Sequence, residues 1–186
     1  MKIRLLSAFF LISILAMSSQ NLPYYEIPEA PKAYTAGTVA GRMIDGLGFR
    51  FYWATEGLTP KDLVFKPTKE SRTSEETITH ILGLSEVILN ATMNIPNANE
   101  KVSMTFDQKR KQILENLKKA SDKLKKTSDL SKLKIIFGEN EFQFWNAMNG
   151  PIADAMWHVG QIVSFRRSTG NPLPKGISVF TGKVKK

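Results

Sequence analysis

The chain contains no cysteine. Disulfide bonds, thiolate metal sites and cysteine nucleophiles are therefore excluded together. Histidine is almost as scarce, because His80 and His158 are the only two in 186 residues. No serine stands in a nucleophile elbow, and no loop has the glycine pattern that cradles phosphate. Any histidine chemistry must therefore depend on these two side chains.

Long apolar runs are also missing, apart from one of about a dozen residues at positions 5–16. This run is too short to span a bilayer, which takes about 20 apolar residues. Lys2 and Arg4 precede it, and residues 16–18 place small side chains at the two positions that a signal peptidase reads. We therefore expect residues 1–20 to be a signal peptide. The mature protein is then expected to be secreted or periplasmic, with no membrane attachment after cleavage.

Acidic residues are fewer than basic ones, 17 against 26, which gives a net charge of +9. Such an excess can indicate binding to nucleic acid or to an anionic surface. Much of it lies in residues 109–134, however, where acidic side chains are mixed with the lysines and no aromatic residue could stack on a base. We therefore expect a solvated helix face there, and no nucleic-acid partner.

Helical periodicity dominates the rest of the sequence. Apolar residues at spacings of three and four predict four helices, over about 36–56, 73–93, 105–127 and 141–170. Glycines at 41, 46 and 48 weaken the first, since each costs a helix about 1 kcal/mol relative to alanine. The second opens with a capping box, Thr73 followed by Glu76. Pro151 lies inside the fourth, which is either kinked there or begins near residue 149.

No strand-like alternation of useful length is found, and proline and glycine interrupt the segment after residue 172. The composition, 42% apolar and 23% charged, is that of an ordinary globular protein. We therefore expect residues 21–186 to form a single all-α domain, a four-helix bundle with an irregular C-terminal tail.

The two histidines fall on predicted helices among apolar neighbours. His80 shares a helix stripe with Leu84 and Val87, and His158 follows Asp154 by one helical turn on the same face. A carboxylate on an apolar stripe needs a partner or a metal ion. Two histidines and one carboxylate suit zinc, nickel or iron and leave coordination positions open. The spacing equally allows a simple hydrogen bond between Asp154 and His158, with His80 as an unrelated core residue.

The segment Asp154-Ala-Met-Trp-His158-Val-Gly160-Gln161-Ile resembles the DinB superfamily of four-helix metal-binding proteins. That family has one histidine on its second helix, which His80 matches, and a pair four residues apart on its last long helix, ahead of Gly-Gln. His158 matches the last ligand, whereas Asp154 stands where many members have histidine. The closing residues 179–183 are similar to those of secreted relatives. The resemblance implies that His80, Asp154 and His158 bind a divalent metal ion.

The same resemblance implies a metal-dependent enzyme that acts on an unknown small-molecule substrate. Members of the family include thiol-dependent transferases and proteins described as hydrolases, and many pair into homodimers. A second reading remains open, in which the metal ion only stabilises a non-catalytic binding or stress-related dimerisation module. The two readings differ in whether the metal ion keeps an open coordination position.

Overall fold

The computed structural model describes residues 22–98 and 102–185, so the expected signal peptide lies outside the described residues. Within these ranges the structure is mostly helical, as the sequence predicts. No helix in the described part of the chain is both long enough and apolar enough to cross a membrane.

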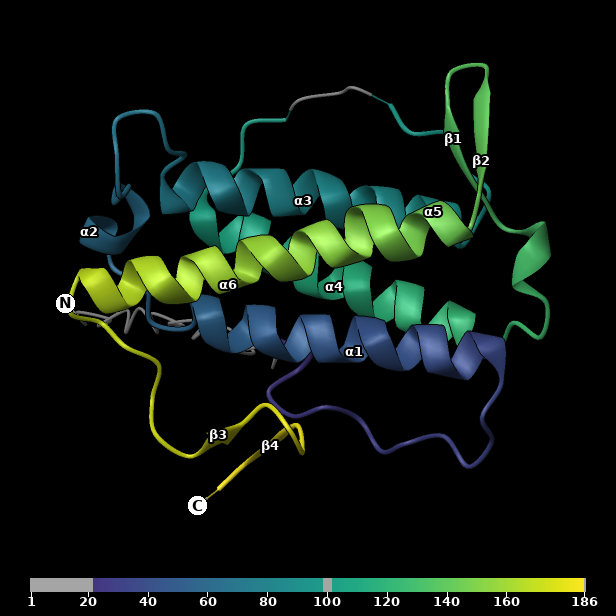
Figure 1. The fold of residues 1–186 in the computed structure, drawn as a ribbon, viewed down its shortest axis with the longest axis horizontal. Coiled ribbons are helices and arrows are strands. Elements are labelled where there is room, and N and C mark those ends of the chain that lie inside the picture. The colour runs from purple at the N-terminus through teal and green to yellow at the C-terminus, as the bar shows by residue number, and fades with distance from the viewer. Residues whose placement is uncertain (1–21, 99–101, 186) are drawn as a thin grey trace, which may run out of the picture.

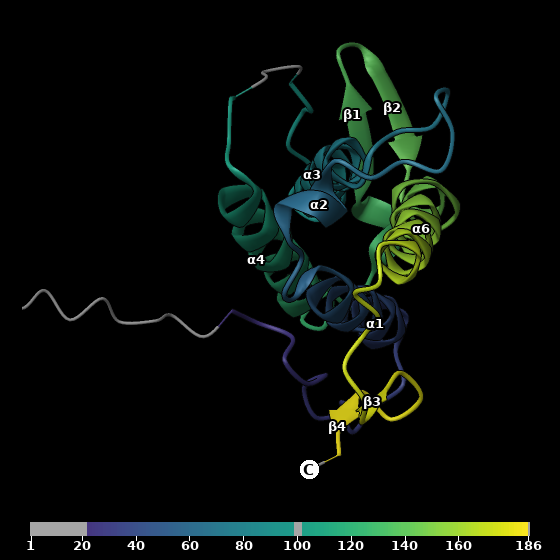
Figure 2. The same cartoon turned by 90° about the vertical axis from the view of Figure 1, so that its left-hand side faces the viewer.

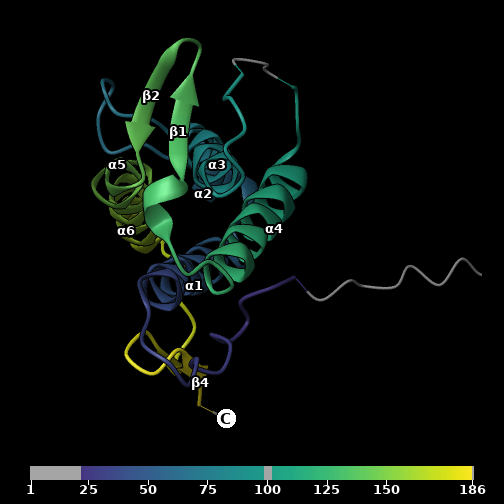
Figure 3. The same ribbon diagram turned by 90° about the vertical axis from the view of Figure 1, so that its right-hand side faces the viewer.

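Four long helices form the body of the structure: α1 (Ala36–Thr55), α3 (Ser74–Ala91), α4 (Phe106–Leu124) and α6 (Ala153–Ser168). Their axes run along the long dimension of the molecule (Figure 1). Viewed end on, they surround a common centre in the order α1, α4, α3, α6 (Figures 2 and 3). Each long helix therefore contacts two others, and α3 lies beside α6.

Threonine capping boxes fix where the helices begin. Thr73 precedes α3, its side chain accepts from the backbone N–H of Glu76, and the Glu76 carboxylate accepts from the Thr73 backbone N–H at 2.7 Å. Thr35 and Thr105 form equivalent boxes before α1 and α4. A fourth box, at Thr59, opens the short helix α2 (Pro60–Leu63), which lies between the first two predicted helices. Each box satisfies backbone N–H groups that have no partner inside the helix.

Two glycines of α1 are required by its packing against α4. A Cβ atom on Gly37 would lie 2.2 Å from the carbonyl oxygen of Leu124, and one on Gly41 would lie 3.1 Å from that of Ser121. The close approach lets α1 and α4 bury a shared apolar face, which offsets the weak helix propensity of glycine. The fully buried large side chains of this core are Ile44, Leu47, Phe51, Ile78, Ile81, Ile88, Ile113, Leu114, Leu117, Leu124 and Ile152.

The expectation that the chain lacks strands was wrong, because two short antiparallel hairpins occur. Strand β1 (Lys134–Phe137) pairs with β2 (Asn140–Gln143) across a turn in which Gly138 has a φ of 58°. Strands β3 (Ile177–Ser178) and β4 (Lys183–Val184) pair in the otherwise irregular tail. Four-residue strands are too short to produce a readable alternation, and their burial is set by the helices beside them.

The fourth predicted helix is shorter than expected and has an irregular beginning. After a 3₁₀ turn (Leu130–Lys132) and the first hairpin come one turn of helix, α5 (Trp145–Ala147), and a π-helical segment, η2 (Met148–Ile152), that leads directly into α6. Gly150 has non-helical dihedral angles of φ −92° and ψ −110°, and Pro151 follows it. Because proline cannot donate a backbone hydrogen bond, the helix is interrupted there rather than continuous from residue 141.

Candidate metal centre

The structure brings the three predicted ligands together where α3 meets α6. His80 lies in the second turn of α3, whereas Asp154 and His158 occupy successive turns near the start of α6. One potential ligand atom from each residue lies within 4.8 Å of the other two. Residues 74 positions apart in sequence therefore form one cluster, and His80 is not an unrelated core histidine.

Asp154 is the shared partner of both histidines. Its Oδ2 atom lies 3.1 Å from Nε2 of His80, and its Oδ1 atom lies 3.3 Å from Nε2 of His158. The two imidazole rings stand nearly perpendicular, at 87°, with their centroids 4.7 Å apart. Both Nε2 atoms therefore face the same carboxylate, which is the arrangement that a cation bound among them requires.

Gln161 sets the orientation of the His158 ring. The Gln161 side-chain oxygen lies 2.8 Å from Nδ1 of His158, one turn along α6. A carbonyl oxygen can only accept, so with the amide in this orientation Nδ1 donates and Nε2 faces the Asp154 carboxylate without a proton. Two acceptor atoms would then face each other at 3.3 Å. A cation or an additional proton between them removes that repulsion, so the donor set fits a divalent metal ion.

The cluster is accessible to solvent. The side chains of His80, Asp154 and His158 are 33%, 42% and 14% exposed. The stripes expected to face inward therefore lie at the outer edge of the contact between α3 and α6, while Ile81, Ile88, Val159 and similar residues occupy the core. Both histidines of the chain are in the cluster, and no further carboxylate of the described residues joins it, so water or substrate could complete the coordination.

The irregular segment before α6 places Asp154. The π-helical turn ends at Ile152, and Asp154 follows in the first turn of α6. Such segments add a residue to the helical repeat and are frequent at functional sites. Pro151 had left open where Asp154 would lie relative to His80, and the structure shows that the interruption is compatible with their contact.

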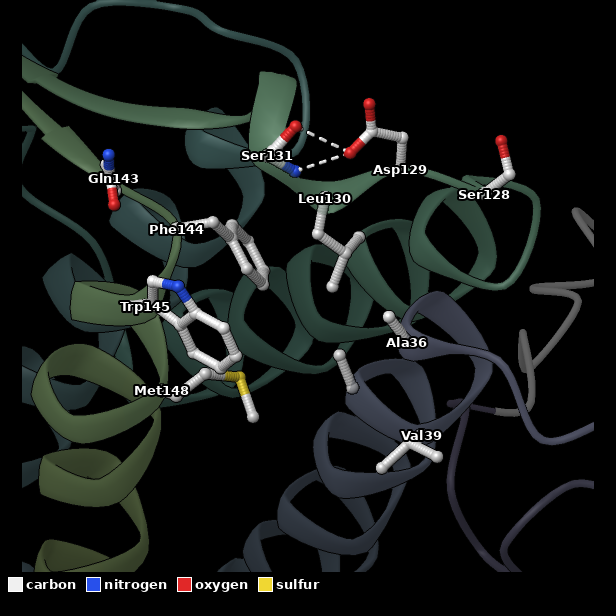
Figure 4. Close-up of a pocket in the computed structure, with 11 residues that line it drawn as sticks. Ala36, Val39, Ser128, Asp129, Leu130, Ser131, Gln143, Phe144, Trp145 and Met148 are labelled. Carbon is white, nitrogen blue, oxygen red and sulfur yellow. Dashed lines mark hydrogen bonds between the residues drawn. The ribbon is translucent and has the colours of Figure 1, made fainter.

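An apolar cavity of about 530 Å³ lies away from the cluster, between the start of α1, the segment after α4 and α5 (Figure 4). It is lined by Ala36, Val39, Ala40, Ser128, Asp129, Leu130, Ser131, Gln143, Phe144, Trp145 and Met148. Asp129 is engaged with the backbone N–H and the hydroxyl of Ser131 (Figure 4). None of the three cluster residues lines this cavity. Trp145, which is 76% exposed, is one of its lining residues.

A second cavity, of about 540 Å³, does reach the cluster, because His80 is one of its lining residues. We call it the α3 groove, since its floor is α3 between His80 and Asn90. Gln112 and Asn116 of α4 form one wall, and Pro96, Asn97 and Phe137 form another. These residues come from separate segments of the sequence and have no motif spacing. The groove could therefore not be predicted from the sequence.

Comparisons with known protein families, with curated proteins and with solved structures found no match.

Proposed function

We propose that the protein is a metal-dependent enzyme whose divalent ion, zinc, nickel or iron, binds His80, Asp154 and His158. The observation that supports this most directly is the approach of all three ligand atoms to within 4.8 Å of one another at a solvent-accessible edge. Only three protein ligands are available in the described residues, which is typical of catalytic rather than structural sites.

The residues of the site have separable tasks in this proposal. His80 and His158 supply neutral nitrogen ligands from two helices, and Asp154 supplies the negative charge between them. Gln161 keeps the His158 proton on Nδ1, so that Nε2 is available as a ligand. A divalent ion held there would lower the pKa of a water molecule or a thiol and would polarise a carbonyl group. Hydrolysis and thiol transfer both need this chemistry.

The resemblance to the DinB superfamily supports the same function. The four long helices and the order in which the candidate ligands occur on α3 and α6 are compatible with a DinB-type four-helix bundle. Asp154 replaces a histidine in that comparison, and a carboxylate makes the site harder and more negative. We also propose export, on the strength of the leader-like residues 1–20. Export would separate the enzyme from cytosolic thiols, which favours hydrolysis.

Cobalt substitution tests for an open metal site. Co²⁺ bound to the wild-type protein should give a visible spectrum that changes when azide or 2-mercaptoethanol is added, because either would occupy an open position. The variants His80→Ala and Asp154→Ala should each weaken Co²⁺ binding, while Asp107→Ala, at an exposed position at the start of α4, should not. A site that binds Co²⁺ but ignores both additives would instead be closed and structural, and would favour the non-catalytic module.

A further inference from the structure

The side-chain amides of the α3 groove form two hydrogen-bonded chains whose directions are fixed by backbone carbonyls. In the first, Nδ2 of Asn97 donates to the backbone oxygen of Ile136 at 2.9 Å. Oδ1 of Asn97 therefore accepts from Nδ2 of Asn90, at 3.0 Å. The carbonyl of Ile136 can only accept, so neither amide can be reversed. The chain ends at the Asn90 side-chain oxygen.

The second hydrogen-bonded chain lies on the α4 side of the groove, and it also starts from a backbone carbonyl, in this case one of α3. The Ser85 hydroxyl donates to the backbone oxygen of Leu82 at 2.7 Å and accepts from Nδ2 of Asn116 at 3.1 Å. Oδ1 of Asn116 then accepts from Nε2 of Gln112, at 2.7 Å. The chain ends at the Gln112 side-chain oxygen. Within the described residues, no donor contacts this oxygen or that of Asn90.

Glu86 adds a charged acceptor to these two oxygens. It lies one turn before Asn90 on α3 and lines the groove together with Gln112. Partial burial raises the pKa of its carboxyl group, and no charged neighbour in the described chain contributes to that shift. Among the described lining residues there is no lysine or arginine, in a protein whose net charge is +9. The described part of the groove therefore presents hydrogen-bond acceptors and the Glu86 carboxyl group.

Gly83 keeps the groove open. It lies on α3 midway between His80 and Glu86, and no heavy atom lies within 4 Å of the position that its Cβ would occupy. Packing therefore does not require glycine here, although glycine costs a helix about 1 kcal/mol relative to alanine. The structural consequence of Gly83 is space above the helix, next to the acceptor groups.

We propose that the α3 groove binds a small organic cation, whose ammonium group is received by Glu86 and by the side-chain oxygens of Asn90 and Gln112. An ammonium group has three N–H donors and one positive charge, which matches these acceptors. The remainder of the ligand would lie over Gly83 towards His80. His80 and Glu86 are six residues apart, which corresponds to about 9 Å along the helix axis. If the ligand is a substrate, its far end reaches the metal centre, and this second step rests on the proposed function.

A charge series of three amides with six carbon atoms each tests the binding step on metal-free protein. The probes are 6-aminohexanamide, which is a cation, hexanamide, which is neutral, and the monoamide of adipic acid, which is an anion. NMR titration of ¹⁵N-labelled protein at pH 7 should show the cation binding at least about tenfold more tightly than either of the others. The shifted signals should belong to α3 and α4. Equal affinities for the three probes would overturn the proposal.

Three variants locate the binding site. Glu86→Gln should remove the preference for the cation, and Gly83→Leu should weaken binding by filling the groove. Glu29→Gln, at a position 94% exposed before α1, should change nothing. A preference that survives in Glu86→Gln would place the cation elsewhere and contradict the assignment.

The orientation of the ligand separates this proposal from that of the metal centre. With Mn²⁺ bound, the ligand protons beside the carboxamide should relax faster than those beside the ammonium group. A cation preference in a protein that cannot bind Mn²⁺ would leave the groove assigned and remove the metal-dependent function. Mn²⁺ binding without a cation preference would leave the metal centre in place and overturn the assignment of the groove.

Discussion

Gln161 contacts one nitrogen of His158 and leaves the other towards Asp154. Its side-chain oxygen lies 2.8 Å from Nδ1, and Nε2 lies 3.3 Å from Oδ1 of Asp154. The contact spans a single helical turn, so the residue that binds and the residue that orients it are positioned by the same element. The contact between His158 and Gln161 therefore lies within α6, while the opposite side of the site is set by the packing of the His158 ring against His80 of α3.

Replacing Gln161 with leucine should weaken metal binding without removing a ligand. Loss of an orienting hydrogen bond typically costs about 10- to 100-fold in metal affinity. Competition with a chromophoric chelator measures the change, and Gln143→Leu, at an exposed position of β2, serves as the control. An unchanged affinity in Gln161→Leu would show that the His158 tautomer is not set by this contact.

Asp62 illustrates a charged residue with a structural task. Its carboxylate is 1% exposed and accepts from the Thr59 backbone N–H, the Thr59 hydroxyl and the Asn171 amide, each at 2.7 Å, and from the Thr169 hydroxyl. Burial alone would raise the pKa of Asp62, but these hydrogen bonds outweigh it and lower the pKa below its usual value. The ionised carboxylate ties α2 to the end of α6.

The lowered pKa of Asp62 predicts a pH dependence of stability. The contribution of the carboxylate should be complete above its unfolded pKa of about 3.9, and should be lost as the pH falls towards the lower folded value. At pH 7, Asp62→Asn should reduce the free energy of unfolding by about 1–3 kcal/mol, because donors lose their acceptor. Urea unfolding should show this difference shrinking below about pH 4. A difference that stays constant down to pH 2.5 would contradict the account.

At the scale of elements, the contact between α1 and α4 includes a buried ion pair. Asp45 of α1, with a side chain 1% exposed, accepts from Nζ of Lys125 at 2.5 Å and from the Ser121 hydroxyl at 2.6 Å. The Tyr24 hydroxyl also donates to it, and burial, followed by the nearby Asp45 charge, raises the pKa of Tyr24, so that the donor stays protonated. The segment before α1 is thereby attached to both helices.

Removing Lys125 should therefore be more costly than removing a surface lysine. Lys125→Ala leaves the Asp45 charge buried with only neutral donors, and should lower the free energy of unfolding by roughly 3 kcal/mol. Lys123→Ala, on the exposed face of α4, should change it by less than about 0.5 kcal/mol. Chemical unfolding of both variants measures the difference. Equal stabilities would show that water compensates Asp45 in place of Lys125.

The helices were predictable because their signals are local. Thr73 and Glu76 form the predicted capping box, and Pro151 marks the interruption that the structure shows beside it. The hairpins were not predictable, since β1 and β2 are defined by their pairing with each other rather than by their own pattern. Gly41 of α1 gave a misleading local signal, because the reason for it lies in the approach of the α4 backbone, whereas Gly48 makes room for the Tyr24 ring.

At the scale of the whole molecule, the candidate site follows from how two helices pack. The pairing of Asp154 with His158 could be read from their spacing, whereas the third member, His80, required either the family resemblance or the structure. The α3 groove required the structure altogether, because its acceptors come from α3, α4 and the segment before α4. Position along the sequence gives no indication that Gln112 and Glu86 line the same cavity.

In the folded structure, two lysines of the basic excess form ion pairs between helices. Lys109 pairs with Glu75 of α3, and Lys125 pairs with Asp45 of α1, so part of the lysine-rich α4 connects helices. Lys118 pairs within α4, with Asp122. The remaining exposed lysines, including Lys119 and Lys123, fit the solvated face that the sequence predicts. The groove that Glu86 lines lies beside this basic helix.

The most direct test of the account is elemental analysis of the protein, purified without an affinity tag or a chelator, beside its His158→Ala variant. The account predicts about one zinc, nickel or iron ion per chain in the wild type and little or none in the variant. Binding should also raise the melting temperature of the wild type alone, because the ion connects α3 to α6 only when folded. No metal in either protein, even after reconstitution with all three ions, would contradict it and leave Asp154 and His158 as a structural pair.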